Sequence, residues 1–340
     1  MTKTLETARK RIKKCRVCPV CNGKACAGEI PGMGGIGSGE GFMNNVKSLA
    51  ALKVIPRYLH SADNPDTSAT LWGKKLSIPL MTGPVGSIAQ LDTDMTTNRY
   101  VEIMARACKE SGIVATLGDT GVLGDLESKY QSAGNTADSL GVFYKPVDVA
   151  AIELRMDMTA KAGCTLCGMD IDAAGFMPLR KLVSPVGVRT AKEIGQMVAL
   201  AHERGLKFII KGIMAADEAR IAVDAGVDGV LVSNHGGRSI DCTPGVAEVL
   251  PAIVDAVGKD TVILADGGVR TGLDILRMIA LGAQAVLVCR PVIVALHEDE
   301  ENGLQQYVAG LISQLQEVMR LTGCQTIGDI GPKVLFDGNR

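Results

Sequence analysis

The segment SNHGGR at residues 233–238 carries the clearest potential for chemistry. His235 is one of only four histidines, and the two glycines after it leave space around its imidazole. Arg238 follows three residues later and has the planar guanidinium that binds a carboxylate through two parallel hydrogen bonds. A base beside a carboxylate anchor is what proton removal from a 2-hydroxy acid requires. We therefore predict that His235 is a base and that Arg238 binds a substrate carboxylate.

Two more charged residues come at the ends of apolar runs. Lys211 follows Phe208-Ile209-Ile210, and a lysine buried there needs an anionic partner, such as a phosphate or an anionic reduced cofactor. A Schiff-base lysine is the alternative. Asp170 ends another run and could orient His235 and stabilise its charge, or it could cap a helix.

Two glycine- and arginine-containing segments, DGGVR (266–270) and CRP (289–291), are typical of phosphate-binding loops. Glycines let backbone N–H groups approach a phosphate, and Arg270 and Arg290 can add charge-assisted contacts. The alternative is that the glycines only form turns and that the arginines are solvated.

Eight short apolar runs alternate with longer helical patterns and would position these residues. The predicted strands cover residues 77–85, 113–119, 139–146, 164–171, 207–213, 229–237, 261–269 and 285–291. Their nearly continuous apolar character is expected of strands buried on both faces. Eight β-then-α units predict an α/β protein with a (β/α)8 TIM barrel, and a doubly wound sheet is the alternative. In such barrels the active site lies where the strands end at their carboxyl termini.

Four cysteines, Cys15, Cys18, Cys21 and Cys26, fall within twelve residues near the N-terminus. Because no secretory signal is apparent, we expect thiols or metal ligands rather than structural disulfides. The first three have the spacing of a ferredoxin-type [4Fe–4S] run. Zinc is the alternative, although structural zinc sites usually pair two separated CxxC units, and free or redox thiols are a third. The glycine-rich stretch 31–41 then predicts a loop that is flexible or covers a ligand.

Composition excludes several classes of protein. The formal charge is −1 and aromatic residues are 3%, which argues against a nucleic-acid binder. No apolar run reaches the roughly 18 residues that span a bilayer. With no secretory signal either, we expect a cytoplasmic protein.

Several segments together resemble the FMN-dependent 2-hydroxy-acid oxidases and dehydrogenases, the family of glycolate oxidase, lactate oxidase and mandelate dehydrogenase. They are VSNHGGR (232–238), ILADGGVRTGLDILRMIALGAQAVLVCRP (263–291), IIKGI (209–213) and the lead-in at 55–84. The resemblance runs from residue 45 to residue 322, and the combination of SNHGGR with DGGVR is highly specific.

The resemblance implies a role for each candidate residue. Lys211 would lie near the flavin N1 and stabilise the reduced ring, His235 would be the base, and Asp170 would support it. Arg238 would bind the substrate carboxylate. FMN would further contact Pro84, Val85, Gly86, Ser233, Asp266, Gly268, Arg270, Cys289 and Arg290.

The chain departs from the family pattern around the substrate. The glycine-rich loop replaces an N-terminal tyrosine, residues 140–144 lack the usual Gln-x-Tyr, and residues 173–176 lack a second carboxylate-binding arginine. Arg180, Lys181 or Arg189 could substitute for that arginine. We therefore expect a retained catalytic centre with a rebuilt substrate pocket.

These observations predict an N-terminal extension (1–45), a barrel (46–322) and a tail (323–340). The predicted activity is the oxidation of an (S)-2-hydroxy acid, or a related carboxylate, to the 2-oxo acid. A non-redox FMN isomerase and a flavin or iron–sulfur redox sensor are the alternatives. An electron-acceptor protein is one predicted partner, with a quinone or oxygen as the other possible acceptors. By resemblance we expect a homo-oligomer, as related enzymes are commonly tetramers.

Overall fold

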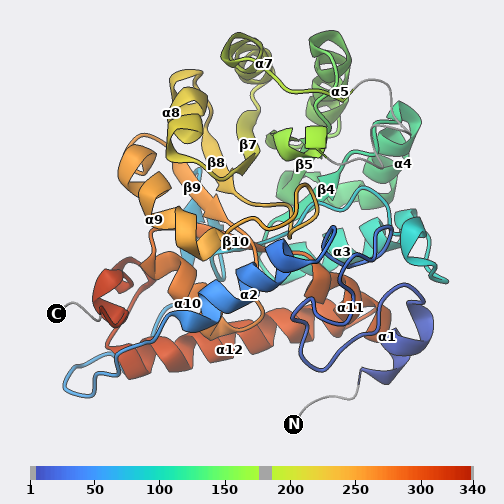
Figure 1. The fold of residues 1–340 in the computed structure, drawn as a ribbon. Helices are drawn as coiled ribbons and strands as arrows, with labels where there is room; N and C mark the ends of the chain where they lie inside the picture. Colours follow the sequence, from blue (N-terminus) through green and yellow to red (C-terminus); the bar gives the residue numbers. More distant parts are fainter. Residues whose placement is uncertain (1–4, 176–185, 338–340) are drawn as a thin grey trace.

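The computed structural model describes residues 5–175 and 186–337, and eight parallel strands form its centre (Figure 1). In chain order they are β3 (Leu80–Thr82), β4 (Ala115–Gly118), β5 (Leu140–Tyr144), β6 (Leu166–Asp170), β7 (Lys207–Ile213), β8 (Gly229–Val232), β9 (Val262–Ala265) and β10 (Ala285–Val288). Each lies inside one of the eight predicted runs, so the TIM-barrel prediction is confirmed.

The barrel closes between its first and last strands and between β3 and β4. Strand β10 pairs with β3 in parallel, Val286 opposite Leu80. Between β3 and β4 the contact is made by two isolated bridges, Met81 with Val114 and Val85 with Leu117. The weaker pairing at this seam leaves the other strands as a continuous ladder in the order β10-β9-β8-β7-β6-β5-β4.

Helices surround the strands and follow the predicted alternation. After successive strands come α3 (Thr97–Glu110), α4 (Leu123–Ala133), α5 (Val149–Lys161), α7 (Ala191–Glu203), α8 (Ala216–Asp224), α9 (Val246–Val257), α10 (Gly272–Ala280) and α12 (Gly303–Thr322). A short helix, α11 (Arg290–Glu298), begins directly after β10. Short 3-10 turns lie at η1 (Ala89–Leu91), η2 (Gly134–Ser139), η3 (Ile171–Gly175), η4 (Ile327–Asp329) and η5 (Pro332–Val334). Thr190 and Thr271 begin α7 and α10 with capping boxes that satisfy the first backbone N–H groups.

Apolar side chains fill the interior of the barrel. Phe143, Ile209 and Leu231 belong to one buried cluster there. Leu71 and Leu76 join the same cluster from the antiparallel hairpin of β1 (Ala69–Leu71) and β2 (Lys74–Leu76). No pattern in the sequence predicted this hairpin, which supplies side chains to the barrel interior.

The N-terminal segment packs against the helices near one end of the barrel. Helix α1 (Glu6–Arg11) contacts α11, and α2 (Glu40–Ala51) contacts α9 and α10. Figure 1 shows the dark-blue chain between α1 and α2 running beside α11. Residues 13–39 contain no helix or strand, and the backbone N–H of Ile36 donates to the carbonyl of Gly237 over 2.8 Å. No helix in the described residues has the length and apolar character to cross a membrane.

Candidate active site

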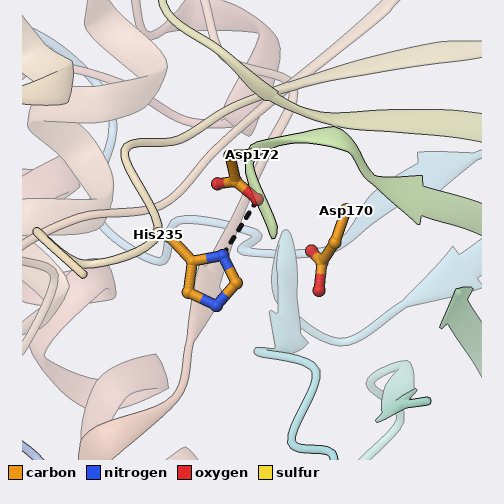
Figure 2. A group of neighbouring side chains, drawn as sticks. All are labelled: Asp170, Asp172 and His235. Carbon is orange, nitrogen blue, oxygen red and sulfur yellow. Dashed lines mark hydrogen bonds and ion pairs between the residues drawn. The ribbon is translucent and has the colours of Figure 1, made fainter. Parts of the chain in front are cut away.

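The site is centred on His235, which follows strand β8. Its Nδ1 lies 2.9 Å from Oδ1 of Asp172 (Figure 2). Nζ of Lys211, on β7, lies 3.3 Å from the same nitrogen. We assign the Nδ1 proton to the hydrogen bond with Asp172, because the carboxylate can accept it and the ammonium cannot. The tautomer then leaves Nε2 as the basic nitrogen.

Asp170 was predicted to orient His235 and to stabilise its charge. The carboxylate within hydrogen-bond distance of the imidazole is that of Asp172, while an oxygen of Asp170 lies within 4.8 Å of a ring nitrogen of His235. As the last residue of β6, Asp170 pairs with two lysines, Lys145 at 2.7 Å and Lys211 at 2.9 Å. Asp172 lies in the 3-10 turn η3, which places its carboxylate beside the imidazole of His235. A Cβ on Gly212 would lie 2.6 Å from Cβ of Asp172, so the close approach of Asp172 to β7 depends on that glycine.

These charged groups are buried and compensate one another. The side chains of Asp170, Asp172 and Lys211 are each at most 8% exposed. Burial raises the pKa of both carboxyls, but the neighbouring Lys211 and His235, together with Lys145 beside Asp170, outweigh it and leave both pKa values below their usual range. Burial lowers the pKa of Lys211, and the surrounding aspartates raise it above its usual value. The site therefore holds ionised carboxylates and a protonated lysine around the imidazole.

The backbone at His235 is constrained. His235, Gly236 and Gly237 all have positive φ, at 56°, 64° and 75°. A non-glycine residue in this region costs on the order of 1–3 kcal/mol. Ser233 stabilises the turn, because its Oγ accepts from the backbone N–H of His235 at 3.0 Å and donates to Oδ2 of Asp266 at 2.8 Å. The turn thus fixes the direction of the imidazole.

Three arginines lie on the same side of the barrel. Nη1 of Arg238 donates to the carbonyls of Gly32 and Gly34, at 2.8 and 3.0 Å. Arg290, at the start of α11, donates to the carbonyl of Met33 at 2.8 Å. Burial and the nearby Arg290 lower the pKa of Arg238 to about 10. The glycine-rich loop therefore contacts both guanidinium groups.

Arg290 and Arg270 also share an aromatic neighbour. The guanidinium of Arg290 lies 3.8 Å from the ring centroid of Phe42, and that of Arg270 lies 6.0 Å from it. Burial lowers the pKa of Arg290, and repulsion from Arg270 lowers it further. Two neighbouring, half-buried cations form an environment that favours an anion.

The remaining predicted residues lie at neighbouring strand ends. Pro84, Val85 and Gly86 follow β3, and the carbonyl of Val85 accepts from the N–H of Gly118 at 3.1 Å. Gly268 has φ of 88° and a Cβ there would lie 2.6 Å from the carbonyl oxygen of Asn45. Cys289 precedes α11, with its Cβ against Gly83.

One of the substitutes proposed for the second arginine, Arg189, is engaged by other residues. Arg189 binds Glu193 and the carbonyl of Pro146, while Arg180 and Lys181 lie outside the described residues.

Three residues of the site were not predicted from the sequence or had no predicted role. Asp172 could have been found as the second carboxylate after β6, two residues beyond the strand end. Lys145 was visible at the end of a predicted strand, and its charge after an apolar run was the same signal that singled out Lys211. No local pattern pointed to Phe42, because its neighbours Arg270 and Arg290 are far away in the chain.

The family model for FMN-dependent dehydrogenase matches residues 33–181 and 188–337. The chain belongs to this family. The FMN-dependent dehydrogenase family comprises flavin oxidoreductases, so the protein is an enzyme that uses FMN. The predicted family is thereby confirmed, and the isomerase and sensor alternatives are not favoured.

Relatives of this chain align with it over most of the length of both proteins. An L-lactate oxidase from Lacticaseibacillus rhamnosus is 31% identical, covering 86% of each chain. A 4-hydroxymandelate oxidase from Amycolatopsis orientalis is 30% identical, covering 87% of this chain and 89% of the relative. The crystal structure of a mandelate oxidase aligns with a TM-score of 0.78 and 26% identity, over 98% of this chain and 96% of that one.

Proposed function

We propose that this enzyme oxidises an (S)-2-hydroxy acid, or a related carboxylate, to the corresponding 2-oxo acid. The observation that carries the proposal is the hydrogen bond between His235 and Asp172, at the end of the barrel that also holds Lys211 and Arg238. The lactate and 4-hydroxymandelate oxidases among the relatives support the substrate class.

The residues present fit FMN. Oδ1 of Asp266 is buried without a hydrogen-bond partner in the described part of the chain, so it can accept from a ribityl hydroxyl. Arg270 and Arg290 form the paired cations that a phosphate would neutralise. Gly268, whose positive φ allows the turn after β9 to pass close to Asn45, would lie beside that phosphate. Pro84, Val85, Gly86, Ser233 and Cys289 would complete the site. When bound, FMN supplies the two-electron acceptor for the oxidation.

His235 would take the substrate proton at Nε2. Its Nδ1–H donates to Asp172, which holds the ring in one orientation and stabilises the imidazolium that forms. Lys211, kept protonated by the aspartates around it, would add a positive charge where the reduced flavin is anionic. The oxidation removes two protons and two electrons from the substrate, and His235 would take one of the protons.

Arg238 would bind the substrate carboxylate. The glycine-rich loop accepts two hydrogen bonds from one of its nitrogens, Nη1, which fixes the plane of the guanidinium. Lys145 lies near the end of β5, a strand that lacks the family's Gln-x-Tyr, and its ammonium group reaches Asp170. We propose that Lys145 helps to shape a substrate pocket that departs from the family pattern.

We further propose that the four cysteines hold a metal centre, either [4Fe–4S] or zinc, and that an acceptor protein reoxidises the enzyme. The cysteine spacing supports the metal, and a redox centre beside a flavin would supply electrons one at a time. Assembly as a homo-oligomer, with a tetramer implied by resemblance, and a cytoplasmic location complete the proposal.

An anaerobic absorption spectrum during titration with a panel of 2-hydroxy acids tests the function. The flavin bands should bleach with one class of acid, and the His235→Ala variant should retain its flavin but bleach at least about 100-fold more slowly. Flavin bands that no 2-hydroxy acid bleaches would contradict the proposed substrate class.

A further inference from the structure

The four cysteines lie in an irregular segment of the chain. All four are half-buried free thiols. They fall within twelve residues, and the ion pair between Arg16 and Glu29 brings the two ends of this run toward each other. They form a single group, although no disulfide joins any of them.

The segment around them lacks its own core. Of the apolar side chains in residues 13–39, only Val17 and Met33 are buried, and the segment has no helix or strand. Irregular segments of this length are uncommon in compact domains unless they are functional. Segments without a sufficient core are commonly held by a disulfide or a metal, and the free thiols leave a metal as the candidate.

The separation of the sulfur atoms favours a cluster over a single ion. Four thiolates on one tetrahedral zinc, at a Zn–S distance of about 2.3 Å, lie about 3.8 Å from one another. Across the described ranges, 5–175 and 186–337, the metal-type ligands that approach within 4.8 Å of one another in groups of three or more belong to Asp170, Asp172 and His235. No three of the four cysteines meet this limit, so their sulfur atoms are not gathered as closely as a single tetrahedral zinc would hold them.

The cysteine group also touches the proposed phosphate arginines. Nη2 of Arg270 donates to Sγ of Cys21 at 3.6 Å, the kind of N–H···S contact that supports cluster sulfurs. A Cβ on Gly23 would lie 2.8 Å from the ring of Phe42, whose ring also contacts Arg290. The cysteine segment therefore contacts the ring of Phe42, and the ring in turn contacts the guanidinium group of Arg290.

The glycine-rich loop is packed into the same unit. A Cβ on Gly34 would lie 2.0 Å from the carbonyl oxygen of Cys26, so loop and cysteine segment meet backbone to backbone. The carbonyls of Gly32 and Gly34 hold Arg238, and that of Met33 holds Arg290. Any displacement of the cysteine segment would move the acceptors of both arginines.

We propose that Cys15, Cys18, Cys21 and Cys26 bind a [4Fe–4S] cluster that clamps the glycine-rich loop onto Arg238 and Arg290, so that affinity for FMN and for the substrate carboxylate depends on cluster occupancy. The inference rests on the proposed function, because it takes Arg290 as a phosphate ligand and Arg238 as the carboxylate ligand.

Metal analysis of the full chain, purified without oxygen, tests the identity of the centre. We expect about four iron and four acid-labile sulfide per chain, and a paramagnetic resonance signal after reduction with dithionite. Zinc without sulfide, or no metal at all, would overturn the cluster.

Flavin binding tests the clamp. In the Cys15→Ser/Cys18→Ser variant, which leaves the contact between Cys21 and Arg270 in place, the FMN Kd should rise at least about tenfold, as for the loss of one hydrogen bond to a charged group. Cys242→Ser, an exposed cysteine outside the group, is the matched control. If the double variant does not fold, the wild-type chain stripped with ferricyanide and EDTA replaces it. An FMN Kd unchanged by loss of the cluster would overturn the clamp.

Two further readouts separate this inference from the proposed function. Oxalate, as a carboxylate probe, should bind less tightly to the stripped protein, and trypsin should cleave faster after Lys24. Both are measured without turnover. If the Cys242→Ser protein binds FMN but no hydroxy acid reduces that FMN, the proposed function is wrong. The clamp is still tested in that case, because FMN and oxalate binding can be compared with and without the cluster.

Discussion

Nδ1 of His235 lies 2.9 Å from Oδ1 of Asp172, a residue of the 3-10 turn that follows β6. The carboxylate nearest to the imidazole nitrogen therefore comes from the turn and not from Asp170 at the end of the strand. The two carboxylates divide the work of the site. Asp172 contacts the imidazole, whereas Asp170 neutralises the lysines Lys145 and Lys211. The hydrogen-bonded carboxylate sets the tautomer, so it should matter more for proton transfer.

Asp172→Asn should slow flavin reduction by a 2-hydroxy acid about 100- to 10,000-fold, because an amide can hold the wrong tautomer and does not stabilise imidazolium. Anaerobic stopped-flow absorbance gives the rate constant. Asp224→Asn, on the exposed face of α8, is the matched control and should leave the rate unchanged. A larger loss in Asp170→Asn than in Asp172→Asn would show that the strand residue supports the base.

Lys145→Met should shift the acid loss of stability to higher pH. The pKa values of Asp170 and Asp172 are lower in the folded chain than the unfolded value of about 3.9. Their contribution to stability is therefore complete above that value and is lost as the pH falls through the folded pKa values. Without Lys145 the burial of Asp170 is less compensated, so its folded pKa rises.

Urea unfolding between pH 3 and pH 7 measures this shift. Lys161→Met, at an exposed lysine in the last turn of α5, should follow the wild-type curve. A Lys145→Met curve that coincides with both would exclude Lys145 as the main cation beside Asp170.

Arg155→Met should lower the free energy of unfolding by about 3–5 kcal/mol, because it leaves Asp119 buried without its ion-pair partner. Nε of Arg155 lies 2.8 Å from Oδ2 of Asp119, and both side chains are at most 5% exposed. Arg220→Met, in an exposed ion pair with Asp260, should change stability little. Equal effects of the two substitutions in urea unfolding would contradict the burial argument.

Gly237→Ala should cost more stability than the same change at Gly205. Both glycines have positive φ, 75° and 70°, which costs an alanine about 1–2 kcal/mol. Only at Gly237 does the new Cβ collide with backbone, 2.2 Å from the nitrogen of Phe42, while nothing lies within 4 Å at Gly205. Chemical unfolding of both variants measures the difference in the free energy of unfolding. Equal losses of stability would show that α2 moves away from the new Cβ at no energetic cost.

The sequence by itself determined the eight β-then-α units, whose number favoured a barrel over a doubly wound sheet. Eight apolar runs buried on both faces can pair only as a parallel sheet covered by helices, and the seven-residue run at 207–213 became β7 without a change of bounds. Because barrel strands present their carboxyl ends on one face, His235, Lys211 and Arg238 could be assigned to one site from their positions in the chain.

Tertiary structure alone decided the partners of these residues. Whether Asp170 or Asp172 meets His235 depends on the path of a 3-10 turn and on the missing side chain of Gly212, which no local pattern encodes. The contact between Cys21 and Arg270 joins residues 249 positions apart. Periodicity reports which face of an element is buried, but the pairing of polar groups is set by the packing of loops over the barrel, and these loops have no repeat.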